Sequence, residues 1–301
     1  MNLIYEHFER EFWTVVNPNA QLETVFDGCR WAEGPVWFGD SGHLLWSDIP
    51  NDRIMRYVPG AGVSVFRHAA GYTNGHSRDR QGRLVSCSHG NRHLERTEID
   101  GTVTVLADRY NGCRLNSPND LVVKSDGTIW FTDPAYGIES DYEGYRAEQE
   151  QSGCYVFRFD PASGDLSVVV DDFVRPNGLA FSADERQLFI GDSGFTHGDH
   201  NPRHVRVFDV EGGRLSNSRV FVDVEPGVPD GFRLDVAGNL WVTAGDGVHV
   251  YTASATLLGK IRTPKVAANL TFGGPRRNWL FICATDSLHV LYTAANGIQR
   301  P

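Results

Sequence analysis

The sequence predicts an all-β fold, a six-bladed β-propeller, on three observations. Short β-rich runs such as Leu-Leu-Trp-Ser-Asp and Thr-Ile-Trp-Phe-Thr-Asp recur along the chain, and a turn precedes each of them. Equivalent positions of these runs are separated by about 40, 45, 59, 52 and 40 residues, which is the period of propeller blades with loops of variable length. Further β-rich runs follow, so that we expect four strands in each unit. The equivalent positions are Leu44, Leu84, Ile129, Leu188, Leu240 and Leu280.

The expected elements follow one another along residues 21–301, which we interpret as a single propeller domain. The strands that follow the repeat runs are expected at 53–57, 155–159, 205–208 and 248–251, and outer strands are expected at 102–106 and 166–170. Residues 1–20 precede the first repeat and are expected to form an N-terminal extension that packs as a helix through Phe12 and Trp13. Residues 134–153 lengthen the third unit with a polar excursion, and residues 195–204 lengthen the fourth.

Composition excludes several classes of function. The 301 residues include 28 Lys and Arg against 38 Asp and Glu, a formal net charge of −10, whereas a nucleic-acid surface needs a basic footprint. No run approaches the ~18–20 apolar residues of a membrane span, and the first residues lack the basic and apolar regions of a secretory signal. Five scattered cysteines are typical of buried thiols in a reducing compartment. We therefore expect a cytoplasmic monomer or dimer with no nucleic-acid or membrane partner.

A polar residue opens the innermost strand expected in each unit, 10 or 11 positions before the repeat position. A propeller stacks equivalent positions around one axis, so that six such side chains should point at one end of the central channel. Buried carboxylates and amides without a partner are costly, and a cation would supply one. The six residues are Glu33, Asn74, Asn119, Asn177, Asp230 and Asn269.

The donors favour a hard divalent ion. Oxygen ligands with about two negative charges suit Ca²⁺ or Mg²⁺ better than an ion that prefers thiolates or imidazoles, and a wide ring with amide donors favours Ca²⁺. The alternative is that Asn-Gly and Asp-Gly are simple turn signals that tolerate positive φ. All six in phase argue for the ring, since Glu33 is no turn former.

Four segments make the chain, from about Trp31 to the C-terminus, similar to the gluconolactonase/regucalcin family, which includes senescence marker protein and luciferin-regenerating enzyme, with paraoxonases as more distant relatives. The resemblance implies a six-bladed propeller with one catalytic divalent metal in the channel. Calcium is the expected ion, with Zn²⁺, Mg²⁺ and Mn²⁺ as alternatives. The segments are Ala32–Trp37, Ser117–Leu121, Arg175–Ser182 and Pro229–Gly231.

Motif matching carries the family's metal ligands onto Glu33, Asn177 and Asp230, and Asn119 matches a position used as a ligand or as a substrate contact. Two departures concern the substrate. Pro118 stands where regucalcin has its sugar-binding arginine, which leaves Arg114 as the candidate replacement. The histidine that opens the second blade of paraoxonases is here Asn74, although His76 and His89 lie close to it in the sequence.

These assignments lead to a hypothesis of metal-assisted hydrolysis of a sugar (aldonic acid) lactone, with gluconolactonase as the leading activity. Asp230 would remove a proton from the attacking water, and Glu33 would mainly hold the metal. The expected substrate contacts are Asn119, Asn74, His76, His89 and Arg114. The alternatives are an arylesterase or phosphotriesterase of the same fold and a non-enzymatic propeller that binds calcium or another ligand.

Two other motifs resemble catalytic or metal sites. Gly191-Asp192-Ser193-Gly194 resembles a serine-protease nucleophile motif, but Asp192 has the repeat phase of Asp48 and Asp133, which predicts a strand end. His197, His200 and His204 have spacing that could bind zinc on a helix. They lie in a segment containing Gly, Asp and Pro, which predicts a solvated turn.

Overall fold

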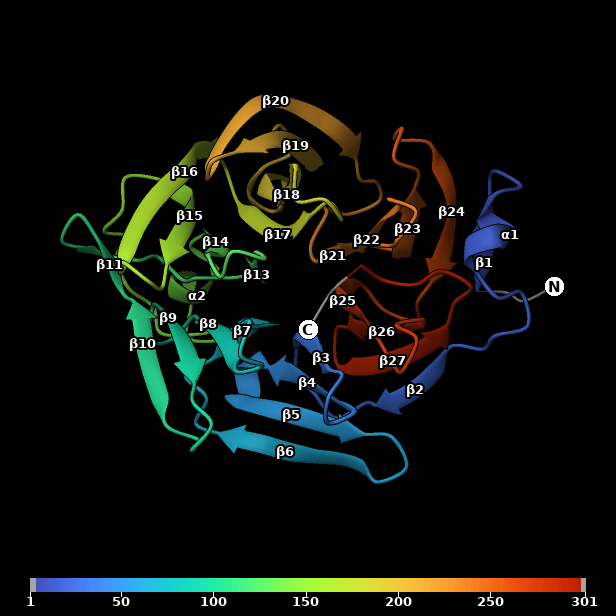
Figure 1. Ribbon diagram of the computed structural model, residues 1–301, viewed down its shortest axis with the longest axis horizontal. Coiled ribbons are helices and arrows are strands. Elements are labelled where there is room, and N and C mark those ends of the chain that lie inside the picture. Colours follow the sequence, from blue (N-terminus) through green and yellow to red (C-terminus); the bar gives the residue numbers. More distant parts are fainter. Residues whose placement is uncertain (1–3, 299–301) are drawn as a thin grey trace.

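The computed structural model describes residues 4–298, which form six antiparallel sheets arranged around a central axis (Figure 1). Each of the first five sheets has four strands that follow in sequence from the axis outward, and an N-terminal strand adds a fifth to the fifth sheet. The sixth sheet has three such strands, and a second N-terminal strand completes it as the fourth. The predicted propeller is therefore confirmed. All six repeat positions lie in the second strand of a blade, as the period predicts.

The first three blades contain the strands expected from the sequence. Blade 1 comprises β3 (Ala32–Phe38), β4 (His43–Asp48), β5 (Arg53–Val58) and β6 (Gly62–His68). Blade 2 comprises β7 (Thr73–Arg78), β8 (Leu84–Ser88), β9 (His93–Thr97) and β10 (Val103–Ala107). Blade 3 comprises β13 (Leu121–Val123), β14 (Ile129–Asp133), β15 (Cys154–Asp160) and β16 (Asp165–Phe173). Between blades 2 and 3, β11 (Arg109–Tyr110) and β12 (Cys113–Arg114) form a short hairpin.

The last three blades repeat the pattern. Blade 4 comprises β17 (Pro176–Phe181), β18 (Gln187–Asp192), β19 (His204–Glu211) and β20 (Arg214–Asp223). Blade 5 comprises β21 (Phe232–Leu234), β22 (Leu240–Ala244), β23 (Gly247–Tyr251) and β24 (Leu257–Arg262). Blade 6 comprises β25 (Ala267–Gly273), β26 (Trp279–Ala284) and β27 (Ser287–Tyr292), and its outer strand is β2 (Glu23–Phe26).

The N-terminal segment closes the ring of blades. Strand β2 pairs with β27, so the first part of the chain completes the last blade. Strand β1 (Tyr5–His7) pairs with β24 and covers the outer edge of blade 5, where an uncovered edge would offer unpaired backbone groups. The helix α1 (Phe12–Val15) follows, and Phe12 is fully buried against blades 5 and 6. The helical packing predicted around Phe12 is thus confirmed, whereas the boundary at residue 20 stays a prediction.

Hydrophobic clusters lie between adjacent blades rather than at the axis. Trp46 packs between blades 1 and 6, Trp130 between blades 3 and 4, and Trp241 between blades 5 and 6. Trp37 and Trp279 are partly buried against the first of these clusters. The recurring tryptophans therefore form inter-blade core, and the channel is left to polar side chains.

Two excursions lengthen the blades where the sequence predicts. Residues 134–153 contain α2 (Tyr136–Glu139), and the turn η2 (Gly194–His197) lies in the lengthened loop of blade 4. A second turn, η1 (Ile49–Asn51), joins β4 to β5. Within residues 4–298 no helix is long and apolar enough to cross a membrane. The five cysteines are free thiols, four of them buried. The cytoplasmic location stays a prediction.

Candidate functional site: a polar ring in the channel

The six residues predicted to form a ring occupy neighbouring places around the axis. Hydrogen bonds lead from one blade to the next: Gly75 N–H donates to Asn119 O at 2.8 Å, and Gly178 N–H donates to Asp230 O at 3.1 Å. Thr132 Oγ1 on β14 donates to Asn177 O at 2.8 Å. The circle closes where the Asn269 side-chain amide donates to Glu33 Oε2 at 2.9 Å. Ring residues far apart in the sequence are therefore neighbours at one end of the channel, and the side chains of Glu33 and Asn269 are in direct contact.

Glycines follow four of the ring residues because the inner strands approach one another there. A Cβ on Gly75 would lie 2.5 Å from Asn119 O, and one on Gly178 would lie 2.2 Å from Asp230 O. A Cβ on Gly231 would lie 2.1 Å from the Asn269 side chain. None of these three has a positive φ. They serve close backbone approach and not turn geometry, so the turn-signal alternative fails at these positions.

Register irregularities aim the ring side chains at the axis. In four of the six blades the pairing of the first two strands shifts at the ring position, for example between Thr73 and His76 and between Pro176 and Leu179. Asn74 and Asn177 lie within these shifts. A β-bulge leaves its extra residue unpaired and redirects its side chain, and bulges are common beside active sites.

The two ring carboxyls interact electrostatically. Glu33 is 3% exposed, and burial, followed by the charges of Asp120 and Glu143, raises its pKa to about 8 against the hydrogen bonds from Asn269 and Gly34. Burial, followed by the charge of Glu33, raises the pKa of Asp230 well above its usual range. Two carboxyls that each resist ionisation indicate a site that lacks a compensating positive charge.

A third carboxyl, which the sequence analysis missed, belongs to the same end of the channel. Glu143 lies in the excursion after α2, its side chain is 25% exposed, and burial raises its pKa to about 7. Its charge contributes to the raised pKa values of both Glu33 and Asp230. The repeat could not identify it because the excursion has no counterpart in other blades. In the sequence, Glu143 is marked only by lying in a polar insertion that directly follows β14, the second strand of blade 3.

His89 connects this excursion to the ring. The His89 side chain is fully buried, and its Nδ1 lies 4.0 Å from Glu143 Oε2. Its Nε2 lies 3.3 Å from the Asn74 side-chain nitrogen, within hydrogen-bond distance. Burial lowers the pKa of His89 to about 4, so the ring is neutral at pH 7 and one nitrogen can accept a hydrogen bond.

Two other expected substrate contacts have partners elsewhere. His76 is 1% exposed, and its ring nitrogens lie 2.8 Å from the hydroxyls of Ser47 and Ser86 on two neighbouring strands. Arg114 Nη2 donates to Asn91 O at 2.9 Å, at the hairpin between blades 2 and 3. Their roles as substrate contacts stay predictions.

The motifs that resembled a protease and a zinc site have structural explanations. Asp192 ends β18, and its carboxylate accepts backbone N–H groups of Val174, Arg175 and Gly194 at 2.9–3.0 Å. The strand-end prediction is confirmed. His197 belongs to the turn η2 in the loop of blade 4. Its Nε2 lies 3.0 Å from Oε1 of Glu139, which ends α2.

The donor chemistry of the ring fits a divalent cation. In residues 4–298 no group of three or more His, Cys, Asp or Glu side chains is placed to hold a metal, but the ring combines two carboxyls with four amides, and amide oxygens are normal Ca²⁺ ligands. Asn74 Oδ1 is buried without a hydrogen-bond partner, and such an atom is costly to leave unsatisfied. The ring thus includes one unsatisfied amide oxygen and two carboxyls with raised pKa values, and a bound cation would stabilise the charged form of the carboxyls.

Comparisons with known proteins agree with the fold. Residues 31–286 match the sequence profile described as "SMP-30/Gluconolactonase/LRE-like region". The chain is 29% identical over 308 residues to a gluconolactonase of Zymomonas mobilis, with 94% of this chain and 84% of that protein covered. It is 28% identical over 267 residues to a pentonolactonase of Haloferax volcanii, covering 86% and 82%. The solved structure of a gluconolactonase from Xanthomonas campestris superposes with a TM-score of 0.90 at 37% identity, covering 96% and 94%.

Proposed function

Because the chain belongs to the SMP-30/gluconolactonase/LRE-like family, we propose that it is a lactonase that opens sugar lactones to hydroxy acids, with an aldonic acid lactone such as gluconolactone as substrate. The observation that carries this proposal is the meeting of Glu33, Asn177 and Asp230 at one end of the channel, where burial raises the pKa values of both carboxyls and the charge of Glu33 raises that of Asp230 further. Similarity to relatives described as a gluconolactonase and a pentonolactonase supports the choice of lactone over aryl ester or phosphotriester.

The proposed metal ligands are Glu33, Asn177, Asp230 and Asn119, and the donor set favours Ca²⁺. When bound, a divalent cation there would polarise the lactone carbonyl and stabilise negative charge in the tetrahedral intermediate. The Asn269 amide would hold the Glu33 carboxylate in place through its 2.9 Å hydrogen bond. Asn177 donates to Ser193 Oγ at 3.1 Å, which fixes its amide so that the oxygen is free to face the channel.

Asp230 is the proposed general base. Asp230 is less buried as a residue than Glu33, and burial, followed by the charge of Glu33, raises its pKa. A cation bound at the ring would favour the ionised carboxylate, which is the form that can accept a proton. Asp230 would take a proton from water as the water oxygen bonds to the lactone carbonyl carbon. As the ring C–O bond breaks, Asp230 would return that proton to the departing alkoxide. The hydroxy acid is then complete and the base is regenerated.

Asn74, His89 and Glu143 are proposed to orient the substrate. Glu143 and His89 come from different blades and approach the ring from the same side, as their 4.0 Å separation indicates. A carboxylate and a neutral imidazole suit the hydroxyl groups of a sugar lactone, since both can accept their hydrogen bonds. An aryl ester would leave these buried acceptors without donors, and unpaired polar groups are a strong basis for discrimination.

Removal and return of metal tests this proposal. The protein is treated with a chelator, freed of it by gel filtration, and assayed by proton release from glucono- and galactonolactone with Ca²⁺, Mg²⁺, Mn²⁺ or Zn²⁺ returned one at a time. We expect the rate to fall to background on stripping and to recover with at least one ion, Ca²⁺ first. Phenyl acetate and a phosphotriester serve as competing substrates. The absence of metal-dependent lactone hydrolysis, or a preference for a competing substrate, would refute the proposal.

A further inference from the structure

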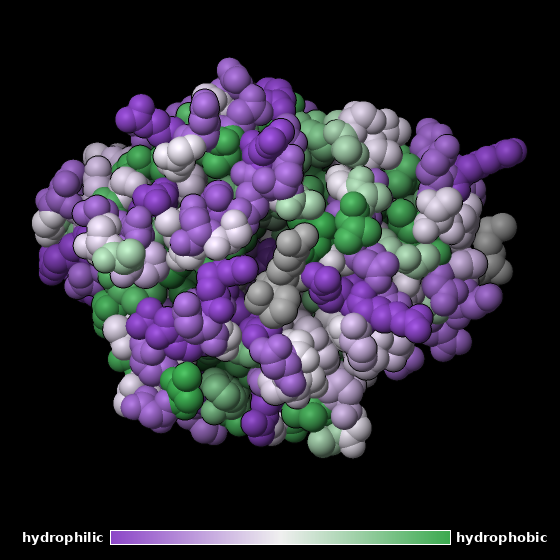
Figure 2. Space-filling model, viewed as in Figure 1, coloured by the Kyte–Doolittle hydropathy of each residue, from purple (hydrophilic) through white to green (hydrophobic). Residues whose placement is uncertain are grey.

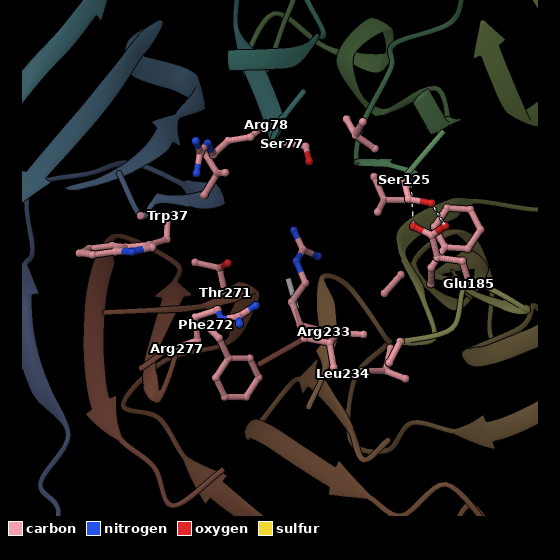
Figure 3. Close-up of a pocket in the computed structure, with 18 of the residues that line it drawn as sticks. Trp37, Ser77, Arg78, Ser125, Glu185, Arg233, Leu234, Thr271, Phe272 and Arg277 are labelled. Atoms are coloured by element: carbon pink, nitrogen blue, oxygen red, sulfur yellow. Dashed lines mark hydrogen bonds between the residues drawn. The ribbon is translucent and has the colours of Figure 1, made fainter. Parts of the chain in front are cut away.

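A cavity of about 540 Å³ opens at the opposite mouth of the channel from the ring. The inner strands begin at the ring residues and run toward this mouth, where their later residues form its lining (Figure 3). Every blade contributes, through Val36, Ser77, Leu121, Leu179, Arg233 and Thr271. No ring residue lines the cavity. Its volume lies within the range of small-molecule sites, about 300–1,000 Å³.

Arg233 is the central charged group of this cavity. The residue is only 5% exposed, and Figure 3 shows its guanidinium extending from β21 toward the middle of the opening. Its Nη1 donates to the carbonyl of Phe232 at 2.7 Å and lies 3.7 Å from Asp120 Oδ2. That carboxylate oxygen is buried and has no hydrogen bond. A buried guanidinium with five donors is thus held by a loose ion pair, which leaves it able to bind another anion.

The remaining charges of the lining favour anions. Four arginines, Arg78, Arg80, Arg233 and Arg277, stand against three carboxylates, Asp40, Asp184 and Glu185, although the whole chain has a net charge of −10. Two of these carboxylates have cationic partners. Asp40 Oδ2 accepts from Arg78 Nη2 at 2.5 Å, and Glu185 Oε2 lies 3.1 Å from Lys124 Nζ. The lining therefore does not share the acidic balance of the whole chain, so that an anion meets little repulsion at this mouth.

The uncharged lining limits the rest of the ligand. The Ser77 hydroxyl can donate a hydrogen bond, whereas that of Ser125 already donates to Glu185, and Leu179 and Phe272 provide apolar wall. Figure 2 shows that hydrophilic side chains predominate around the hollow near the centre of the face it presents. An organic anion combines the required features, since its charged group suits Arg233 and its carbon skeleton suits the walls.

We propose that this cavity is a second ligand site, separate from the ring, that binds a small organic anion through its carboxylate or phosphate group at Arg233. The two sites share one channel. Asp120 links them, because it follows the ring residue Asn119 in the chain and faces Arg233 at 3.7 Å. An anion that draws Arg233 away from Asp120 would therefore weaken the ion pair of the residue that directly follows the ring residue Asn119.

Isothermal titration of the full-length, metal-free protein tests the proposal, with inorganic phosphate, gluconate and 6-phosphogluconate as probes. We expect saturable binding of at least one probe with a dissociation constant of about 1 mM or below. Arg233→Gln should weaken that binding at least about 10-fold, because a charge-assisted hydrogen bond is lost. Arg206→Gln, which changes an arginine of the outer face paired with Asp172, is the matched control and should leave it unchanged.

Two further variants make the result decisive if Arg233→Gln misfolds. Ser77→Phe fills the cavity without removing a charge and should also abolish binding. Asp230→Ala, which removes the proposed base of lactone hydrolysis, should leave anion binding intact, so that failure of the lactonase proposal would be distinguished from failure of this one. The absence of saturable binding by all three probes, or equal binding by wild type and Ser77→Phe, would overturn the proposal. Preference among the probes would separate carboxylate from phosphate recognition.

Discussion

Asn269 donates its side-chain amide to Glu33 Oε2 at 2.9 Å, and this bond joins the last blade to the first across 236 residues of sequence. The side-chain oxygen of Asn269, Oδ1, in turn accepts the N–H of Leu270 at 2.8 Å, which fixes the amide's orientation. Glu33 Oε2 also accepts the N–H of Gly34 at 2.7 Å. The carboxylate is thus positioned by two donors, although burial opposes its charge. Such positioning is needed for a group that must meet a cation rather than a neighbouring side chain.

Asp230→Ala tests the proposed base. We expect kcat for lactone hydrolysis to fall by about 10²–10⁴, the usual contribution of a general base, while the circular dichroism spectrum and Tm remain those of a folded propeller. Asp223→Ala, at the exposed end of β20 in the preceding blade, should retain wild-type activity. Retention of activity by Asp230→Ala would assign the proton transfer to another group.

Glu33→Gln tests the cost of the buried carboxyl. Burial raises the pKa of Glu33 from 4.5 to about 8, so the folded metal-free protein holds a proton that the unfolded chain has released between these values. The stabilising contribution of this group is complete below pH 4.5 and is lost as the pH rises through about 8. Urea unfolding at pH 6 and pH 9 should therefore show a decrease in the free energy of unfolding that is smaller in Glu33→Gln. An equal decrease in both proteins would contradict the raised pKa.

Gly178→Ala tests the close approach of the inner strands. The added Cβ would lie 2.2 Å from the backbone oxygen of Asp230, so that one strand must shift away from the axis. Overpacking of this kind costs about 1–3 kcal/mol, and the shift should also lower kcat/KM. Gly39→Ala is the control, because its Cβ would meet only Trp37 Nε1 at 3.9 Å. Thermal unfolding and lactone kinetics of the two variants should differ clearly, and equal behaviour would exclude steric control of the ring by Gly178.

Glu143→Ala tests the third carboxyl. If Glu143 accepts hydrogen bonds from the hydroxyls of the lactone, its loss should raise KM several-fold with a smaller effect on kcat. A simple lactone without hydroxyls, such as δ-valerolactone, should be hydrolysed at the wild-type rate. Glu148→Ala, an exposed change in the same excursion, is the matched control. A large decrease in kcat for both lactones would instead indicate a role in proton transfer or metal binding.

The fold and the ring could be predicted because both are properties of the repeat. Period and turn position fix the strand that carries Leu44 or Leu240, and the same phase places Glu33 and Asp230 at the axis. The covering strands β1 and β2 were not predicted as strands. They pair with β24 and β27, which lie more than 200 residues away in the sequence. A pattern within one short segment cannot predict a pairing over that separation.

Other site features depend on contacts that occur once in the chain. Glu143 lies in an excursion without a counterpart in other blades, so the repeat gives it no position. His76 is a predicted substrate contact because it lies close to Asn74 in the sequence. In a bulged strand a spacing of two residues does not by itself keep two side chains on the same face. His76 contacts the serines of neighbouring strands, and its role as a substrate contact stays a prediction.

Anomalous diffraction from crystals soaked in Mn²⁺, with Ca²⁺ as competitor, tests the central claim most directly. The account predicts one strong peak at the axis, about 2.1–2.6 Å from oxygens of Glu33, Asn177 and Asp230, that Ca²⁺ displaces and that is lost in Glu33→Gln. A peak elsewhere, or none at the ring at saturating metal, would contradict the proposal that Glu33, Asn177, Asp230 and Asn119 form a metal centre.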